Sequence, residues 1–429
     1  MERFLERRWF HAAILAALCA AVIAAYSGAF NAGFHFDDIP QIVENYTIRD
    51  LKNLPQIILS SRGLTMATFA LNYSVGGMDP KGFHVVNILI HAINGILVYF
   101  LVFNTLFTVS GDSPWSKKIS AYSAFLFALH PVQTQAVTYI VQRMESLASL
   151  FYLLALLAFI KGAGASASLK RFVFYAGVVL FYILSFKSKE IAITLPALVV
   201  LYDIWFVAPK GGLKSRLPLY GVLAVLLVYF VAATIVPLGG FGDLSAQLSG
   251  QFQSIPAATG PATTGVGAPT AGFGVKGISP FEYLLTQFNV LIYYIALLFV
   301  PINQNLDYDF PVSRGLFEVP QVKQGTVLNI PLPPPVISLL ILLFIIGAGV
   351  YLFMKSRRNP LSKRASAISF FIFWFFIILS PTSSFIPVID VIFEHRVYLA
   401  SLGFFVIFAI CFDWFFEWLG RGRGGASES

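Results

Sequence analysis

Two adjacent aspartates, Asp37 and Asp38, follow the first apolar segment of the chain closely. Like charges near a bilayer raise the pKa of one carboxyl group and prepare a carboxylate to accept a proton from a hydroxyl. Acid pairs are also common in solvated loops, so the pair alone leaves a catalytic and a plain surface role open. The catalytic role would be that of a general base at a membrane surface.

The composition indicates a membrane protein. The chain has 429 residues, of which 57% are hydrophobic and 12% charged, with a mean hydropathy of +0.76, which excludes an ordinary soluble globular protein. A helix needs about 20 apolar residues to cross a bilayer. Eleven segments qualify: 9–30, 84–108, 119–137, 146–160, 172–186, 190–207, 217–238, 283–300, 336–354, 366–380 and 397–416. These predict an all-α polytopic protein with ten to eleven transmembrane helices, forming one membrane domain over 1–429.

The loop charges predict the orientation of these helices. Arg7 and Arg8 precede segment 9–30, which we interpret as an uncleaved anchor with a cytoplasmic N-terminus. With this start, the first seven segments cross the membrane in alternating directions and their basic loops all lie in the cytoplasm. The basic loop 355–364 remains cytoplasmic only if segment 283–300 is re-entrant or interfacial. We therefore expect an integral multi-pass membrane protein, which in a prokaryote would lie in the plasma or inner membrane.

On this topology the long loops lie outside, so the active site is expected on the extracytoplasmic face. The first outer loop, 31–83, has apolar residues at helical spacing, which predicts short amphipathic helices on the membrane. Loop 239–282 begins with a nearly uncharged Gly, Pro, Thr and Ala tract and is predicted to be flexible, while 336–416 holds the C-terminal helices. The net charge of +8 is attributed to the cytoplasmic loops rather than to nucleic-acid binding. Cys19 and Cys411 lie in apolar segments and imply no disulfide framework.

Three predicted outer helix ends carry Lys or Arg, although basic residues usually gather in cytoplasmic loops. They are Arg143 with Glu145, Lys187 and Lys189 with Glu190, and Arg396 with His395 and Glu394. Salt bridges with the outer acids would compensate any one of them. Because three clusters recur at one depth, we favour an anionic ligand, and phosphate suits both Arg and Lys.

A polar stripe follows on the next helix. His84, Asn87, His91 and Asn94 are spaced three, four and three residues apart, which places them on one helix face. Such a stripe is typical of hydrogen bonding between membrane helices. His84, nearer the outer end, is equally compatible with a supporting role in a site, and His91 is the other candidate for such a role.

An outer carboxylate base with cations at headgroup depth indicates glycosyl transfer from a lipid phosphate. The sequence has no glycine-rich phosphate loop, hydrolase elbow or HExxH zinc helix. A lipid-linked sugar flippase would need charges buried midway along the spans and repeated halves. A non-catalytic scaffold would explain the hydrophobicity but not an acidic pair facing cationic clusters.

Six runs in order resemble a known family. They are FHFDDIPQIVEN (34–45), RGLTMATFALNYSVGGMDPKGFHVVNILIHAINGILVY (62–99), LHPVQTQAVTYIVQRMESLAS (129–149), SKEIAITLPALVVLYD (188–203), LTQFNVLIYYIALLFVPINQNLDYDFP (285–311) and EHRVYLAS (394–401). The chain is similar to the membrane part of the transmembrane and tetratricopeptide-repeat O-mannosyltransferases and their prokaryotic relatives. The resemblance implies a GT-C-like helical bundle that uses a polyprenyl-phosphate sugar on the extracytoplasmic side.

The resemblance also implies roles for single residues. Asp37 matches the first acid of the family's motif and is expected to be the base, with Asp38 supporting it, in an inverting single displacement. Arg396 and His395 match the late motif near the donor phosphate. No cofactor is required; a divalent metal held by the two aspartates is the alternative to the cations. The expected acceptor is a protein or glycan. No repeat array follows residue 416, so acceptor recognition is expected from the outer loops or a separate subunit.

Overall fold

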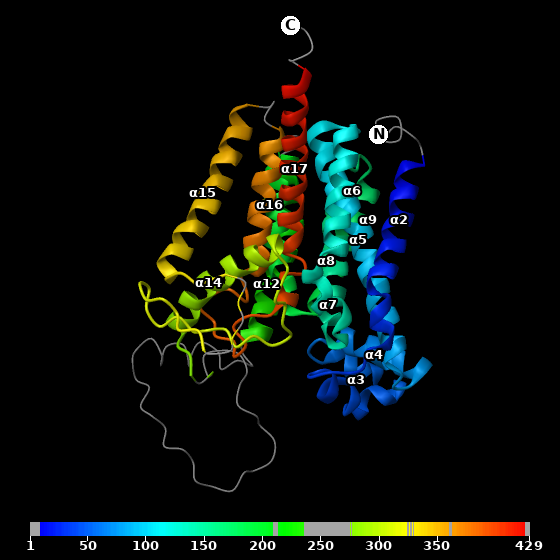
Figure 1. Ribbon diagram of the computed structural model, residues 1–429. Coiled ribbons are helices and arrows are strands. Elements are labelled where there is room, and N and C mark those ends of the chain that lie inside the picture. The colour runs from blue at the N-terminus through cyan, green and yellow to red at the C-terminus, as the bar shows by residue number, and fades with distance from the viewer. Residues whose placement is uncertain are drawn as a thin grey trace. The chain divides into compact units, whose positions relative to one another are not determined.

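The structure is a computed structural model that describes residues 9–208, 213–235, 277–323, 330–359 and 363–424, and the isolated residues 275, 326 and 328. All regular elements within these residues are helices, which confirms the all-α polytopic fold class (Figure 1). Nine of the described helices are long and apolar enough to cross a membrane, and Arg364–Leu379 is apolar but shorter. Each of the eleven predicted segments overlaps one of the described helices. Most of the predicted flexible loop, 239–274, lies outside the described residues.

The chain forms two compact units, and the first consists of residues 1–223, 344–379 and 394–429. Its helices are α2 (Phe10–Tyr26), α3 (Leu54–Leu59), α4 (Gly63–Gly76), α5 (Pro80–Ser110), α6 (Pro114–Leu129), α7 (Thr134–Thr138), α8 (Arg143–Ala163), α9 (Ser168–Phe186), α10 (Leu195–Tyr202), α16 (Lys363–Leu379) and α17 (Ser401–Gly424). The long helix α5 packs against α2, α6 and α8, and α17 packs against α6 and α16 (Figure 1).

Local sequence signals explain where these helices begin and end. Asp79 caps α5 by accepting the N–H of Lys81, Pro80 occupies the first turn, and Gly111 ends the helix with a φ of +72°. α6 differs from the predicted segment 119–137. It begins earlier, at Pro114, and ends at Leu129, because the proline at position 131 disfavours a helical conformation for His130. The short helix α7 then completes the segment.

The first loop contains the predicted short helices. The turn between α3 and α4 requires Gly63, since an added Cβ would lie 2.2 Å from the carbonyl oxygen of Ile57. Arg62, which precedes it, adopts a φ of +52°. The Leu64 N–H donates to the Lys187 carbonyl at 3.1 Å, so this turn is fastened to the end of α9.

The second unit, residues 224–343 and 380–393, is built on α14 (Pro280–Phe299). A capping box between Ser279 and Glu282 begins this helix, and the Gln287 amide donates to the Val391 carbonyl at 2.9 Å. Helices α12 (Leu217–Ile235) and α15 (Pro335–Arg358) each belong to both units. α14 is unbroken, and its length and composition would allow a crossing. The prediction that it does not cross rests on loop charge alone.

Candidate functional site

The two aspartates have different surroundings. The Asp38 side chain is buried, with 1% of the residue exposed. One of its oxygens accepts the backbone N–H of His35 at 3.0 Å and the other that of Val141 at 2.7 Å. Asp37 is exposed, and its backbone N–H donates to the Tyr139 hydroxyl at 2.8 Å. Asp38 therefore fastens the turn to the segment before α8, while Asp37 presents its carboxylate at the surface.

Burial changes the acidity of Asp38. Removal from water raises the pKa of this carboxyl to about 6, and neighbouring Asp37 adds to the rise. The two N–H bonds and nearby His35 act in the opposite direction without cancelling it. Its two accepted hydrogen bonds give Asp38 a structural role in shaping the turn. Asp37 has the exposure that a general base needs.

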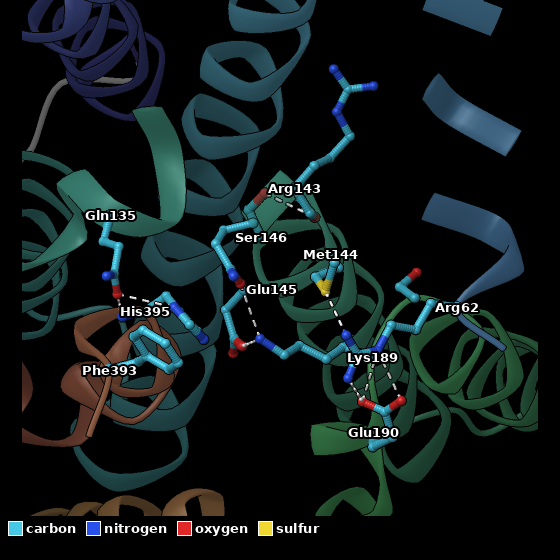
Figure 2. A network of polar contacts seen from close by, with 12 residues as sticks. Arg62, Gln135, Arg143, Met144, Glu145, Ser146, Lys189, Glu190, Phe393 and His395 are labelled. Carbon is cyan, nitrogen blue, oxygen red and sulfur yellow. Dashed lines mark hydrogen bonds and ion pairs between the residues drawn. The ribbon is translucent and has the colours of Figure 1, made fainter. Parts of the chain in front are cut away.

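An ionic cluster lies where α4, α8 and the turn before α10 begin. The Lys189 ammonium contacts the Glu145 carboxylate at 2.8 Å and also donates to the Gln142 side-chain oxygen at 3.2 Å. The Arg62 guanidinium forks onto Glu190, with Nε 2.9 Å from one oxygen and Nη2 3.0 Å from the other. Figure 2 shows the two ion pairs together.

Two atoms of this cluster have weak or absent partners. Nη1 of Arg62 lies 3.2 Å from the Met144 sulfur, which is a weak acceptor. Oε1 of Glu145 is buried and accepts no hydrogen bond from the protein. For Lys189, the sequence left a salt bridge and an anionic ligand as alternatives. The geometry has the salt bridges in place and leaves one edge of Arg62 able to donate to an anion.

Arg62 links the aspartate turn to the late motif electrostatically. Burial acts to lower its pKa, but Glu190, then Glu145 and Asp37, raise the pKa above its ordinary value. Arg62 in turn helps to lower the pKa of His395, after burial, Lys189 and Arg396. Arg62 therefore interacts electrostatically with both Asp37 and His395.

The late motif forms a buried turn, Glu394–Val397. The His395 backbone N–H donates to the Gln135 side-chain oxygen at 2.6 Å, and its Nδ1 lies 3.0 Å from the same oxygen. Because a carbonyl oxygen only accepts, Nδ1 carries the proton in this contact. The lowered pKa keeps the imidazole neutral at physiological pH, so the motif contributes charge through Arg396. Glu394 and Arg396 are also buried.

Two predicted phosphate ligands are held by the protein itself. Arg143 is fully buried and donates to the Asn87 side-chain oxygen at 2.6 Å and to the Phe83 carbonyl at 3.0 Å. Its guanidinium carbon lies 4.5 Å from the centre of the Phe69 ring, so Arg143 joins α4, α5 and α8. Lys187 donates to the Leu59 carbonyl at 3.1 Å. For both residues, phosphate binding stays a prediction.

The polar stripe of α5 lies buried between helices. The His91 ring contacts the Tyr398 hydroxyl at 2.7 Å and the Ala128 carbonyl at 2.9 Å. Asn94 donates to the Ser146 carbonyl at 2.8 Å. His84 contacts the Ala32 carbonyl at 3.2 Å, while its Nδ1 is buried and has no protein partner. These contacts match the expected packing role for His91 and Asn94.

Sequence reasoning missed four residues that organise the site: Arg62, Gln135, Tyr139 and Gln142. All lie within the two runs at 62–99 and 129–149. A cation in the loop that carries the aspartate pair was a usable signal for Arg62. The amides and the phenol carried none, because only the fold shows what they contact. Within the described ranges, no three His, Cys, Asp or Glu side chains converge on a possible metal position.

Fold and site together define a polytopic helical membrane protein with an exposed carboxylate beside an ionic cluster. The predicted resemblance is confirmed by named relatives. Protein O-mannosyl-transferase TMTC2 of Mus musculus is 34% identical over 161 residues, which are 37% of this chain and 18% of that protein. TMTC4 of Homo sapiens is 33% identical over 210 residues, 41% and 27% of the two chains. Tmtc3 of Drosophila melanogaster is 31% identical over 224 residues, 44% and 24%.

The matched segments thus span 18% to 27% of the length of these relatives. No family model matches the chain, and no solved structure matches it. The similarity therefore concerns one part of larger proteins.

Proposed function

We propose that this protein is a glycosyltransferase that moves mannose from a polyprenyl-phosphate donor to a hydroxyl of a protein acceptor. The observation that carries the proposal is the exposed Asp37 carboxylate, held on a turn that is fastened to Tyr139, together with its electrostatic effect on the half-buried Arg62 of the ionic cluster. A glycosyl transfer needs a base for the nucleophile and cations for the departing phosphate. The relatives named as protein O-mannosyl-transferases support the reaction class, the sugar and the acceptor.

The proposed reaction is a single displacement. Asp37 takes the proton of the acceptor hydroxyl as its oxygen attacks the anomeric carbon. The bond from that carbon to the donor phosphate oxygen breaks, and the phosphate leaves with the bonding electrons. One displacement inverts the anomeric configuration.

The departing phosphate is proposed to bind at the ionic cluster. Arg62 can donate through Nη1, whose present partner is a thioether sulfur. Lys189 and Arg396 supply further positive charge close to His395, as their effects on its pKa indicate. Neutral His395 can contribute a hydrogen bond but no charge. These cations would do the work that a divalent metal does in other transferases.

The proposed location follows from loop charge. If the basic loops are cytoplasmic, Asp37, Lys189 and the late motif share the extracytoplasmic face. There the acceptor would be an exported protein, held by the outer loops or by a separate subunit. A flippase of the same donor is the alternative from another class.

The test is a donor panel with the purified full-length chain in detergent, where no transport can be scored. Polyprenyl-phosphate mannose should give a mannosylated acceptor peptide by mass spectrometry, and NMR should show inversion. EDTA should leave the rate unchanged. Donor binding without any transfer would favour the flippase. Loss of transfer with EDTA would show that the reaction needs a divalent metal.

A further inference from the structure

The residue before the proposed base has an unusual conformation. Among the described residues, three other than glycine have a positive φ: Phe36 at +45°, Arg62 and Asn303. Such a conformation is strained for a bulky side chain. Two of the three lie at the candidate site, and such strain tends to gather where function requires it.

Hydrogen bonds on both sides of Phe36 maintain this backbone conformation. The Ile39 N–H donates to the Phe36 carbonyl at 3.0 Å, and the Asp38 N–H donates to the His35 carbonyl at 2.9 Å. The bonds of Asp37 to Tyr139 and of Asp38 to Val141 then fasten the turn to the bundle. The backbone at Phe36 is therefore imposed by the same contacts that place the base.

The Phe36 side chain gains little from the fold. The residue is 62% exposed, whereas Phe34, two positions earlier, packs against Phe83 with ring centres 5.5 Å apart. Glycine or asparagine would adopt the backbone more easily, and a polar residue would suit the exposure. An exposed aromatic in a strained turn is thus unfavourable on two counts for the isolated chain, which points to an external contact.

We infer that the Phe36 ring is a binding platform for the sugar of the lipid-linked donor. A pyranose offers an apolar face of C–H groups to an aromatic ring, and its hydroxyls suit the neighbouring Asp37 carboxylate and Tyr139 hydroxyl. The position fits as well, because the anomeric carbon must lie about 3–3.5 Å from the oxygen that Asp37 activates. The inference rests on the proposed function and assigns part of its donor specificity.

The test compares two ligands, polyprenyl-phosphate mannose and bare polyprenyl phosphate, for binding to the full chain in detergent. Phe36→Ala should weaken binding of the mannose-loaded donor about 2- to 12-fold, the range of an aromatic contact, and leave binding of the bare lipid unchanged. Phe36→Tyr should retain wild-type binding. Phe36→Leu, which keeps the apolar bulk, should behave like the alanine variant. Tyr46→Ala is the matched control, since Tyr46 is 73% exposed on the same loop and its ring already contacts Arg49.

Other outcomes would overturn the inference. Equal weakening of both ligands, or wild-type binding by Phe36→Leu, would mean that the ring contacts the lipid. Unchanged donor binding with a raised KM for the acceptor peptide would assign the ring to the acceptor. A wild-type chain that transfers mannose while Phe36→Ala binds both ligands normally would sink this inference alone. A wild-type chain that binds no sugar-loaded lipid would refute the donor proposal as well.

Discussion

Titration of Asp38 should make the stability of the protein depend on pH. Its carboxyl has a pKa of about 6 in the folded chain, against an ordinary value of 3.8. The folded state therefore holds this proton more tightly than the unfolded state does, and the free energy of unfolding falls as pH rises from 4 to 7. The shift corresponds to about 3 kcal/mol in total, of which about 1.3 kcal/mol is lost between pH 5 and pH 7.

The assay is reversible unfolding in mixed micelles, with wild type and Asp38→Asn measured at pH 5 and pH 7. Asparagine carries no charge at either pH and keeps an oxygen for the Val141 N–H. Taking the difference between the two proteins cancels other groups, including His395, whose lowered pKa has the opposite effect on stability. Relative to the variant, wild type should lose about 1.3 kcal/mol between pH 5 and pH 7.

Two results would refute this reasoning. A difference that does not change with pH would mean that Asp38 titrates as an exposed carboxyl does, and that the turn is not packed as described. A difference that grows in favour of wild type when the same comparison is made between pH 3 and pH 5 would mean that the two N–H bonds outweigh burial. In either case the assignment of separate roles to Asp37 and Asp38 would lose its physical basis.

Three further predictions concern the residues around the base. Tyr139→Phe removes the hydroxyl that accepts the Asp37 N–H, so kcat should fall about 10-fold with an unchanged KM for the donor; an unchanged kcat would show that the contact does not position the base. Arg62→Lys keeps the charge but loses the fork onto Glu190, and should weaken donor binding about 10-fold in a titration; wild-type affinity would exclude Arg62 as a phosphate ligand. Arg143→Ala leaves two buried acceptors and the partly buried Thr68 hydroxyl without their donor, so the free energy of unfolding should fall by about 3 kcal/mol or more. If that variant is instead stable but has a raised donor KM, Arg143 is a phosphate ligand.

The helices could be predicted because their signals are local. Apolar length, the Asp79 and Ser113 caps and Gly111 fix segments of the first unit without reference to distant residues. The apolar run of segment 119–137 continues across Pro131, whereas α6 ends at Leu129, so apolar length alone does not locate the end of this helix. Membrane orientation depends on loop charge, which the fold of the chain alone does not measure.

The candidate site was only partly predictable, because roles in it depend on distant partners. Asp37 and Asp38 look alike in the sequence, and the N–H of Val141, more than a hundred residues later, separates them. Arg143 and Arg62 are both cations at helix ends, yet Arg143 is enclosed by Asn87 and Phe83 while Arg62 keeps an open edge. Tertiary packing decided which of these charges was left for a ligand.

The most direct test of the central claim is the single-turnover rate of mannose transfer by Asp37→Asn in detergent. Because the amide keeps the shape of the side chain but cannot accept the proton, the rate should fall about 100-fold or more. Binding of polyprenyl-phosphate mannose and the free energy of unfolding should stay close to wild type, since Asp37 is exposed. Glu44→Gln, which changes another exposed acid of the same loop, should transfer normally. Wild-type transfer by Asp37→Asn would contradict the account and place the base elsewhere.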